Sequence, residues 1–161
     1  MLVSAGFSKD NSAPSRIIRD VTGAPCSHAF LILDVAEFGQ EVVWEASAFG
    51  LRQITLARFL AANTLVDRVS FGTALQPGIR WAIDELGDRY SFLKLFGMGV
   101  VYAGRALKKK WDNPAHSAHS MFCSELVTTV LQKSGVPAVV GLVPEDTSPG
   151  DLLAVLQRSV S

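Results

Sequence analysis

The nucleophile candidate of this chain is Cys123, one of only two cysteines. It stands in the segment Phe122-Cys123-Ser124-Glu125-Leu126-Val127, whose pattern predicts that a helix begins there. A helix N-terminus carries partial positive charge and free N–H groups, which favour a thiolate and can receive a developing oxyanion. Nucleophilic chemistry also needs a base, and His28 is the histidine best placed to act as one.

Glu45 is the group that could orient His28, provided that the two residues lie on neighbouring strands. Residues 27–34 form a short apolar run bounded by turn signals, which is typical of a buried strand, and residues 41–46 predict its hairpin partner. If the last residue of the first strand pairs with the first residue of the second, His28 and Glu45 share one face as diagonal neighbours. A slip of one residue would separate them, and the sequence does not fix the register.

The rest of the chain predicts mainly helices, each indicated by apolar residues at helical spacing and by capping residues at its ends. Helical patterns cover residues 12–22, 56–62, 77–86, 123–131 and 149–156, a longer apolar segment with three glycines covers 90–107, and one further strand is predicted at 64–71. Short strands beside helices of this kind predict an α+β fold, and a chain of 161 residues fits a single domain, residues 1–161.

Composition excludes several classes of function. Fifteen basic and fifteen acidic residues leave no net charge to attract nucleic acid, and no phosphate-binding glycine loop or zinc-peptidase motif occurs. Two cysteines are too few for a disulfide scaffold, which favours a reducing compartment or a free functional thiol. The N-terminal residues lack the pattern of a signal peptide, and no apolar run is long enough to span a membrane, so a cytoplasmic location is the default expectation. The oligomeric state stays open.

One basic segment offers a membrane contact as an alternative. The apolar run Phe92–Gly104 is followed by Lys108-Lys109-Lys110, an arrangement that could lie against an anionic lipid surface. A buried helix with a solvated basic end is the favoured interpretation.

Each candidate catalytic residue also has a structural alternative. A cysteine on the apolar stripe of a helix is usually a small core residue, a histidine in an apolar strand is often a satisfied core residue, and Glu45 could simply pair with Arg52. A zinc site built from His116, His119 and Cys123 is a further alternative, although no C-x-x-C pair supports it. The expectation is therefore a site without metal or other cofactor.

The order of these motifs resembles a known family. Ser27-His28-Ala29-Phe30-Leu31-Ile32, then Trp44-Glu45-Ala46, then a stretch containing Tyr90, then the Cys123 segment, is similar to the circularly permuted NlpC-type papain-like hydrolases. YiiX-like proteins and, more distantly, lecithin:retinol acyltransferase-like enzymes belong to this group. In the permuted order the histidine strand and its polar partner precede the cysteine helix, as they do here.

The resemblance implies a small antiparallel sheet packed against a helix that carries the cysteine at its N-terminus. It also implies cleavage or transfer at an amide or ester through a thioacyl intermediate, with Cys123 as nucleophile, His28 as base and then acid, and Glu45 as orienting group. The Cys123 N–H would help to bind the oxyanion, and Tyr90 would line the substrate site. The leading expectation is a cysteine hydrolase that cleaves an amide bond in a small peptide or similar substrate.

Two other functions stay open, a lipid acyltransferase or thioesterase of the same fold and a non-catalytic binding or structural module. Cys26 adds one hypothesis of its own. It lies two residues before His28 and is predicted on the same strand face, where a disulfide with Cys123 could switch activity off.

Overall fold

The computed structural model describes residues 1–36, 39–47, 50–71, 75–87 and 118–160. Within these residues the chain is an α+β protein built on one five-stranded antiparallel sheet of order β4-β3-β2-β1-β5. The strands are β1 (Leu2–Lys9), β2 (His28–Val35), β3 (Gln40–Ser47), β4 (Gly50–Thr55) and β5 (Thr64–Ser70). The helices are α1 (Ala13–Thr22), α2 (Leu56–Leu60), α3 (Gln76–Gly87), α5 (Ala118–Lys133) and α6 (Pro149–Val160), with short 3₁₀ turns η2 (Pro137–Val139) and η3 (Pro144–Asp146). Tyr90, the apolar run 92–104 and the lysines 108–110 lie outside the described residues.

The β2–β3 hairpin has the register on which the site prediction depended. Asp34 pairs with Glu41 and Leu31 with Trp44, so the two strands meet as expected for a tight antiparallel connection. Gly39, with a φ of 60°, supplies the left-handed backbone of that connection. Continued by one pair, this register puts Phe30 opposite Glu45. His28 lies two residues before Phe30 on β2, so His28 and Glu45 share one face of the sheet.

The first strand, β1, was not predicted, although it is an interior strand of the sheet, between β2 and β5. Both of its faces are buried, with Val3, Ala5 and Phe7 on one face and Ser4 and Ser8 on the other. This second face needs a small residue, because a β-carbon on Gly6 would lie 2.4 Å from the Phe30 ring. The small polar residues of β1 thus make room for the bulky residues of β2.

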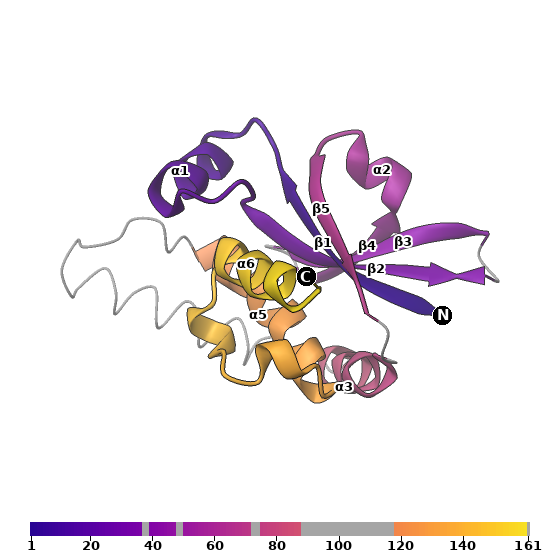
Figure 1. Ribbon diagram of the computed structural model, residues 1–161. Helices are drawn as coiled ribbons and strands as arrows, with labels where there is room; N and C mark the ends of the chain where they lie inside the picture. Colours follow the sequence, from indigo (N-terminus) through magenta and orange to yellow (C-terminus); the bar gives the residue numbers. More distant parts are fainter. Residues whose placement is uncertain (37–38, 48–49, 72–74, 88–117, 161) are drawn as a thin grey trace.

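Helices cover the two faces of the sheet unequally (Figure 1). Helices α3, α5 and α6 gather on one side, where they enclose the larger core, which includes Phe7, Leu31, Leu126, Val127, Val130, Leu131, Leu152 and Leu156. The short helix α2 covers the other side, where Phe59 packs on Phe30, Ile32 and Val43. The smaller cluster closes one side of the strand that carries His28.

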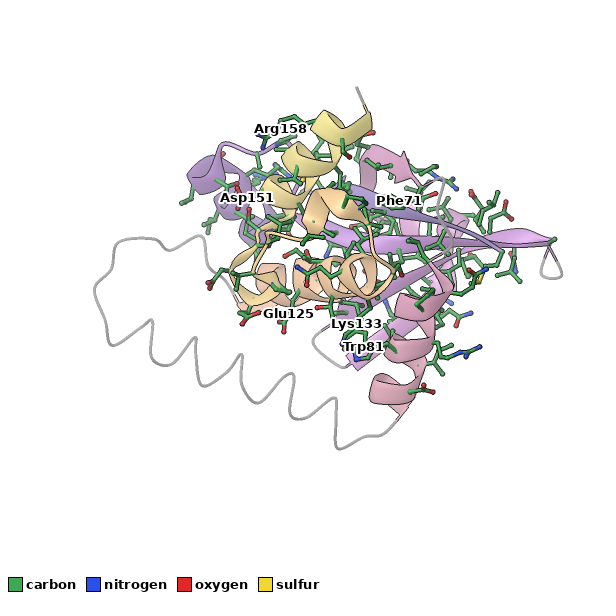
Figure 2. All side chains as sticks on the ribbon, turned by 60° about the horizontal axis from the view of Figure 1, so that its bottom comes forward. Phe71, Trp81, Glu125, Lys133, Asp151 and Arg158 are labelled. Carbon is green, nitrogen blue, oxygen red and sulfur yellow. The ribbon has the colours of Figure 1, made fainter. Side chains whose placement is uncertain are left out.

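Local signals set both ends of α1 and the C-terminal end of α5 as predicted. The Ser12 side chain accepts a hydrogen bond from the Ser15 N–H at the start of α1, and Gly23, with a φ of 65°, ends that helix. Gly135, with a φ of 72°, follows the end of α5. Near that end, Lys133 lies over the Trp81 ring of α3 (Figure 2), with its Nζ 5.9 Å from the ring centre. This contact joins two helices of the larger core.

The start of α5 differs from the prediction. The helix begins at Ala118, so Cys123 is its sixth residue and lies in the second turn rather than at the N-terminus. The N–H of a residue at that position lies within the helix, opposite the carbonyl four residues earlier. The prediction was wrong because Asn113-Pro114 and the following serines and histidines suggested a loop up to the cysteine. His119 belongs to this first turn, and His116 lies outside the described residues.

Candidate active site

His28 and Glu45 form a direct hydrogen bond. Nε2 of His28, at the start of β2, lies 2.6 Å from a carboxylate oxygen of Glu45, on β3. The side chain of Glu45 is 5% exposed and that of His28 is 24% exposed, so the pair is buried with one edge open to solvent. The predicted contact between these two residues is therefore present in the structure.

Glu45 also binds Arg52, which faces it directly across the β3–β4 ladder. Both Nε and Nη2 of Arg52 donate to Oε1 of Glu45, while Oε2 is the oxygen bonded to His28. Burial by itself raises the pKa of the Glu45 carboxyl, but the bonds from His28 and Arg52 outweigh it and hold that pKa below its usual value. The sequence offered the histidine and the arginine as alternative partners of Glu45, and the structure contains both.

Cys123 is the third group at this position. It acts on His28 both as a hydrogen-bond partner and through its charge. Burial alone lowers the pKa of His28, but the Cys123 sulfur and the Glu45 carboxylate stabilise the imidazolium and raise the pKa to about 10. Because Nε2 of the ring is bonded to Glu45, Nδ1 is the nitrogen left for the thiol. Residues from α5, β2 and β3 thus meet as a cysteine, a histidine and a glutamate.

Two aromatic rings, those of Phe30 and Phe59, stack with the imidazole of His28 on the same side of the sheet. The ring centre of His28 lies 5.8 Å from that of Phe30 and 6.2 Å from that of Phe59, at interplanar angles of 22° and 26°. Phe59 comes from α2, so this short helix contributes to the orientation of the candidate base. Sequence analysis found no role for it beyond a helical pattern.

Cys26 occupies a different environment from the one predicted. It precedes β2 and is buried in the larger core, whereas Phe30 belongs to the smaller cluster on the His28 side, so the prediction of a shared face was wrong. Cys26 and Cys123 are not joined by a disulfide, and both are fully buried. Burial, with the charge of Cys123 as a second cause, raises the pKa of the Cys26 thiol to about 12. Cys26 therefore stays protonated at neutral pH, which leaves Cys123 as the only candidate thiolate.

A cavity of about 320 Å³ opens beside the His28–Glu45 pair. Its wall has both polar and apolar parts and comes from the β1–α1 connection, α1, β2, β3, β4 and the residues that follow α2. The polar lining residues are Asp10, Ser12, Ser15, Ser27, His28, Glu45, Arg52 and Asn63. Cys123 does not line this cavity and is fully buried, so the cavity reaches the candidate base but not the sulfur.

Two buried serines fasten the wall of the cavity to the histidine strand. The hydroxyls of Ser15, in α1, and Ser27, next to His28, lie 2.7 Å apart. Ser15 also receives a hydrogen bond from Arg19 at 2.9 Å and donates one to the Asp10 carbonyl at 3.1 Å. Sequence analysis did not single out these residues, and the N-cap pattern at Ser12 was the only signal that this segment is fixed in place.

Metal and membrane sites receive no support from the described part of the chain. It holds no group of three or more His, Cys, Asp or Glu residues that could bind a metal ion. The zinc alternative included His116, which lies outside the described residues. None of the helices described combines the length and the apolar character needed to cross a membrane.

Comparisons with known proteins give no match. The chain matches no protein-family model and no curated protein sequence. Its function is therefore inferred from the site geometry and from the sequence resemblance.

Proposed function

We propose that the protein is a cysteine hydrolase that cleaves an amide bond through a thioacyl intermediate, with Cys123 as nucleophile, His28 as acid and base, and Glu45 as orienting group. The observation that carries the proposal is the convergence of these three side chains from α5, β2 and β3. A core cysteine and a core histidine do not need a buried carboxylate, which is costly to bury unless it is paired. The arrangement also agrees with the permuted NlpC-type papain-like order of the motifs.

In the first step, the Cys123 thiolate attacks the carbonyl carbon of the substrate amide. The imidazolium of His28 then gives its proton to the amine as the C–N bond breaks, which leaves a thioester on Cys123. Glu45 keeps the ring oriented and stabilises its positive charge, because Oε2 remains bonded to Nε2 throughout. Because the Cys123 N–H lies inside α5, another donor must bind the oxyanion.

In the second step, water cleaves the thioester. His28, now neutral, takes a proton from the water as the water attacks the thioester and keeps it. The C–S bond then breaks, the carboxylic acid leaves, and the thiolate–imidazolium pair forms again. Charged and polar groups in the wall of the cavity next to His28, among them Asp10, Arg52 and Asn63, support a substrate that carries polar groups, such as an amide.

A substrate must be able to reach the Cys123 sulfur. Cys123 is fully buried, while the cavity ends at His28 and Glu45. Acylation therefore requires a local opening that joins the cavity to the sulfur, and this opening limits the rate for bulky acyl donors.

The test is to trap the thioacyl intermediate with a small activated ester, p-nitrophenyl acetate. We expect the intact mass of the protein to increase by one acetyl group, located on Cys123 by peptide mapping. The Cys26→Ala variant should acylate normally, whereas Cys123→Ala and His28→Ala should not, with circular dichroism to confirm that each variant is folded. Acylation that is retained in folded Cys123→Ala, or absent from the wild type, would contradict the proposal. Release of fatty acid from phospholipid vesicles, without cleavage of soluble amides, would favour the lipid enzyme instead.

A further inference from the structure

We propose that Arg52 is a positioning residue of this site and supplies the second positive charge that allows Cys123 and Glu45 to be ionised at the same time. The inference rests on the proposed function, because it concerns the ionised state in which the thiol would react. It is carried by the way Arg52 and His28 divide the two oxygens of one buried carboxylate.

The backbone register fixes the contact between Arg52 and Glu45. The two residues are direct partners in the antiparallel β3–β4 ladder, so their side chains leave the same face of the sheet side by side. Two N–H groups of the guanidinium converge on Oε1, which restrains rotation of the carboxylate. Oε2 is thereby directed at Nε2 of His28, 2.6 Å away. The ring is then held with Nδ1 free for the sulfur.

Besides orienting the Glu45 carboxylate, Arg52 balances the charge of the site. A reactive pair contains a thiolate at Cys123 and an imidazolium at His28, and Glu45 adds a second negative charge that is 5% exposed. Two anions would share a single cation at a buried position, which is unfavourable. With Arg52 the group contains two anions and two cations. The Arg52 side chain is 52% exposed, so the second cation stays partly hydrated and its burial costs little.

The other charged groups around Glu45 do not replace Arg52. Asp10, from the connection between β1 and α1, acts on His28 and is itself negative. Asn63, after α2, lines the same cavity but is uncharged, and Arg58 of α2 is exposed. Among the described residues, Arg52 is the one arginine or lysine that forms an ion pair with Glu45.

The experiment compares wild type with Arg52→Gln and Arg52→Lys by carbon-13 NMR titration of the Glu45 carboxyl, assigned with Glu45→Gln. We expect the midpoint to rise by about one pH unit or more in Arg52→Gln, because an adjacent cation lowers a carboxyl pKa by about 1 to 3 pH units. Arg52→Lys keeps the charge but loses the two-pronged contact, so its titration midpoint should stay close to that of wild type while its acylation by p-nitrophenyl acetate slows. Arg68→Gln is the matched control, since it removes another arginine bound to a β3 glutamate.

Acylation gives the second measurement. In Arg52→Gln the acylation rate at pH values below the wild-type Glu45 midpoint should fall roughly tenfold, because a midpoint that rises by one pH unit leaves about a tenth of the ionised Glu45 there. The rate should recover as the pH rises. A Glu45 midpoint that is the same in Arg52→Gln as in Arg68→Gln would overturn the inference. The NMR titration needs no turnover, so an unchanged midpoint rejects the role of Arg52, whereas failure of wild-type Cys123 to acylate rejects the proposed function.

Discussion

Two glutamates of β3, Glu41 and Glu45, each bind an arginine, yet their surroundings differ. Glu41 pairs with Arg68 at 2.6 Å, and both side chains are 32% exposed. Glu45 pairs with Arg52 but is 5% exposed, and its second oxygen is bonded to His28. The two glutamates are four residues apart and lie on the same face of one strand, so strand geometry alone does not distinguish them.

The difference shows what turns an ion pair into a candidate site. The pair at Glu41 resembles a surface salt bridge, which contributes little because water screens it. At Glu45, burial raises the energy of an unpaired charge, and the histidine connects that charge to Cys123. Burial and a titratable neighbour, rather than the presence of an arginine, mark Glu45 as chemically useful.

The largest expected effect comes from exchanging each glutamate for glutamine. Glu45→Gln keeps the shape of the side chain but removes the charge that stabilises the imidazolium, so acylation of Cys123 should slow by about 10²- to 10⁴-fold. Glu41→Gln should acylate at the wild-type rate. The rates are measured as release of p-nitrophenol under single-turnover conditions. Equal rates for the two variants would remove the distinction between the glutamates.

The stability of the protein should also depend on the charge of His28. Its pKa in the folded protein, about 10, lies above the ordinary value of 6.5, so the stabilisation is complete below about pH 6.5 and is lost as the pH rises through about 10. We expect the free energy of unfolding in urea to fall by roughly 1 to 3 kcal/mol over this range. The decrease should be smaller in Glu45→Gln and unchanged in Glu41→Gln, and a flat wild-type profile would speak against a charged His28.

A third glutamate, Glu125, has a pKa that is shifted in the opposite direction from that of Glu45. Burial, together with the charge of Glu145, raises the pKa of Glu125 in α5 to about 7. Because this folded-state pKa lies above the ordinary value of 4.5, stability is lost as the pH rises through about 7. Glu125→Gln should therefore stabilise the protein by about 1 kcal/mol above this pH and have little effect near pH 4.5. Urea unfolding at both pH values checks the sign, and destabilisation of the variant at the higher pH would contradict it.

The smallest expected effect concerns Cys26. Cys26→Ala should lower the free energy of unfolding by about 1 kcal/mol, because it removes one buried atom from the core, and should leave acylation of Cys123 unchanged. Thermal unfolding and the acylation assay check the two parts. The disulfide between Cys26 and Cys123 stays a prediction that mild oxidation tests, through the intact mass under non-reducing conditions. Two free thiols after oxidation would exclude it.

Much of the fold followed from local signals. The strands that carry His28 and Glu45 and the helix that carries Cys123 were predicted, because short apolar strands, a glycine turn and helical spacing are encoded in neighbouring residues. The register of the two strands was assumed, and the structure has it. The buried face of α5, with Leu126, Val127, Val130 and Leu131, was predicted in the same way and is confirmed.

The parts that were missed depend on contacts between distant segments. Strand β1 is polar or small at every second position, and in the interior of the sheet the Phe30 ring of β2 covers its Gly6. The parity argument failed at Cys26 because β2 begins only at His28. The simultaneous binding of His28 and Arg52 to Glu45 requires three strands in register, which no single segment encodes.

The most direct measurement of the central claim is the ultraviolet absorbance of the Cys123 thiolate, taken as the difference between wild type and Cys123→Ser across pH. It does not depend on access of a reagent to the buried sulfur, and Cys26 does not contribute at neutral pH because its pKa is about 12. A thiolate–imidazolium pair predicts thiolate absorbance at neutral pH that is lost in folded His28→Ala. Absorbance that develops only near pH ~8.5, as for an ordinary cysteine, and that does not change in His28→Ala would contradict the account.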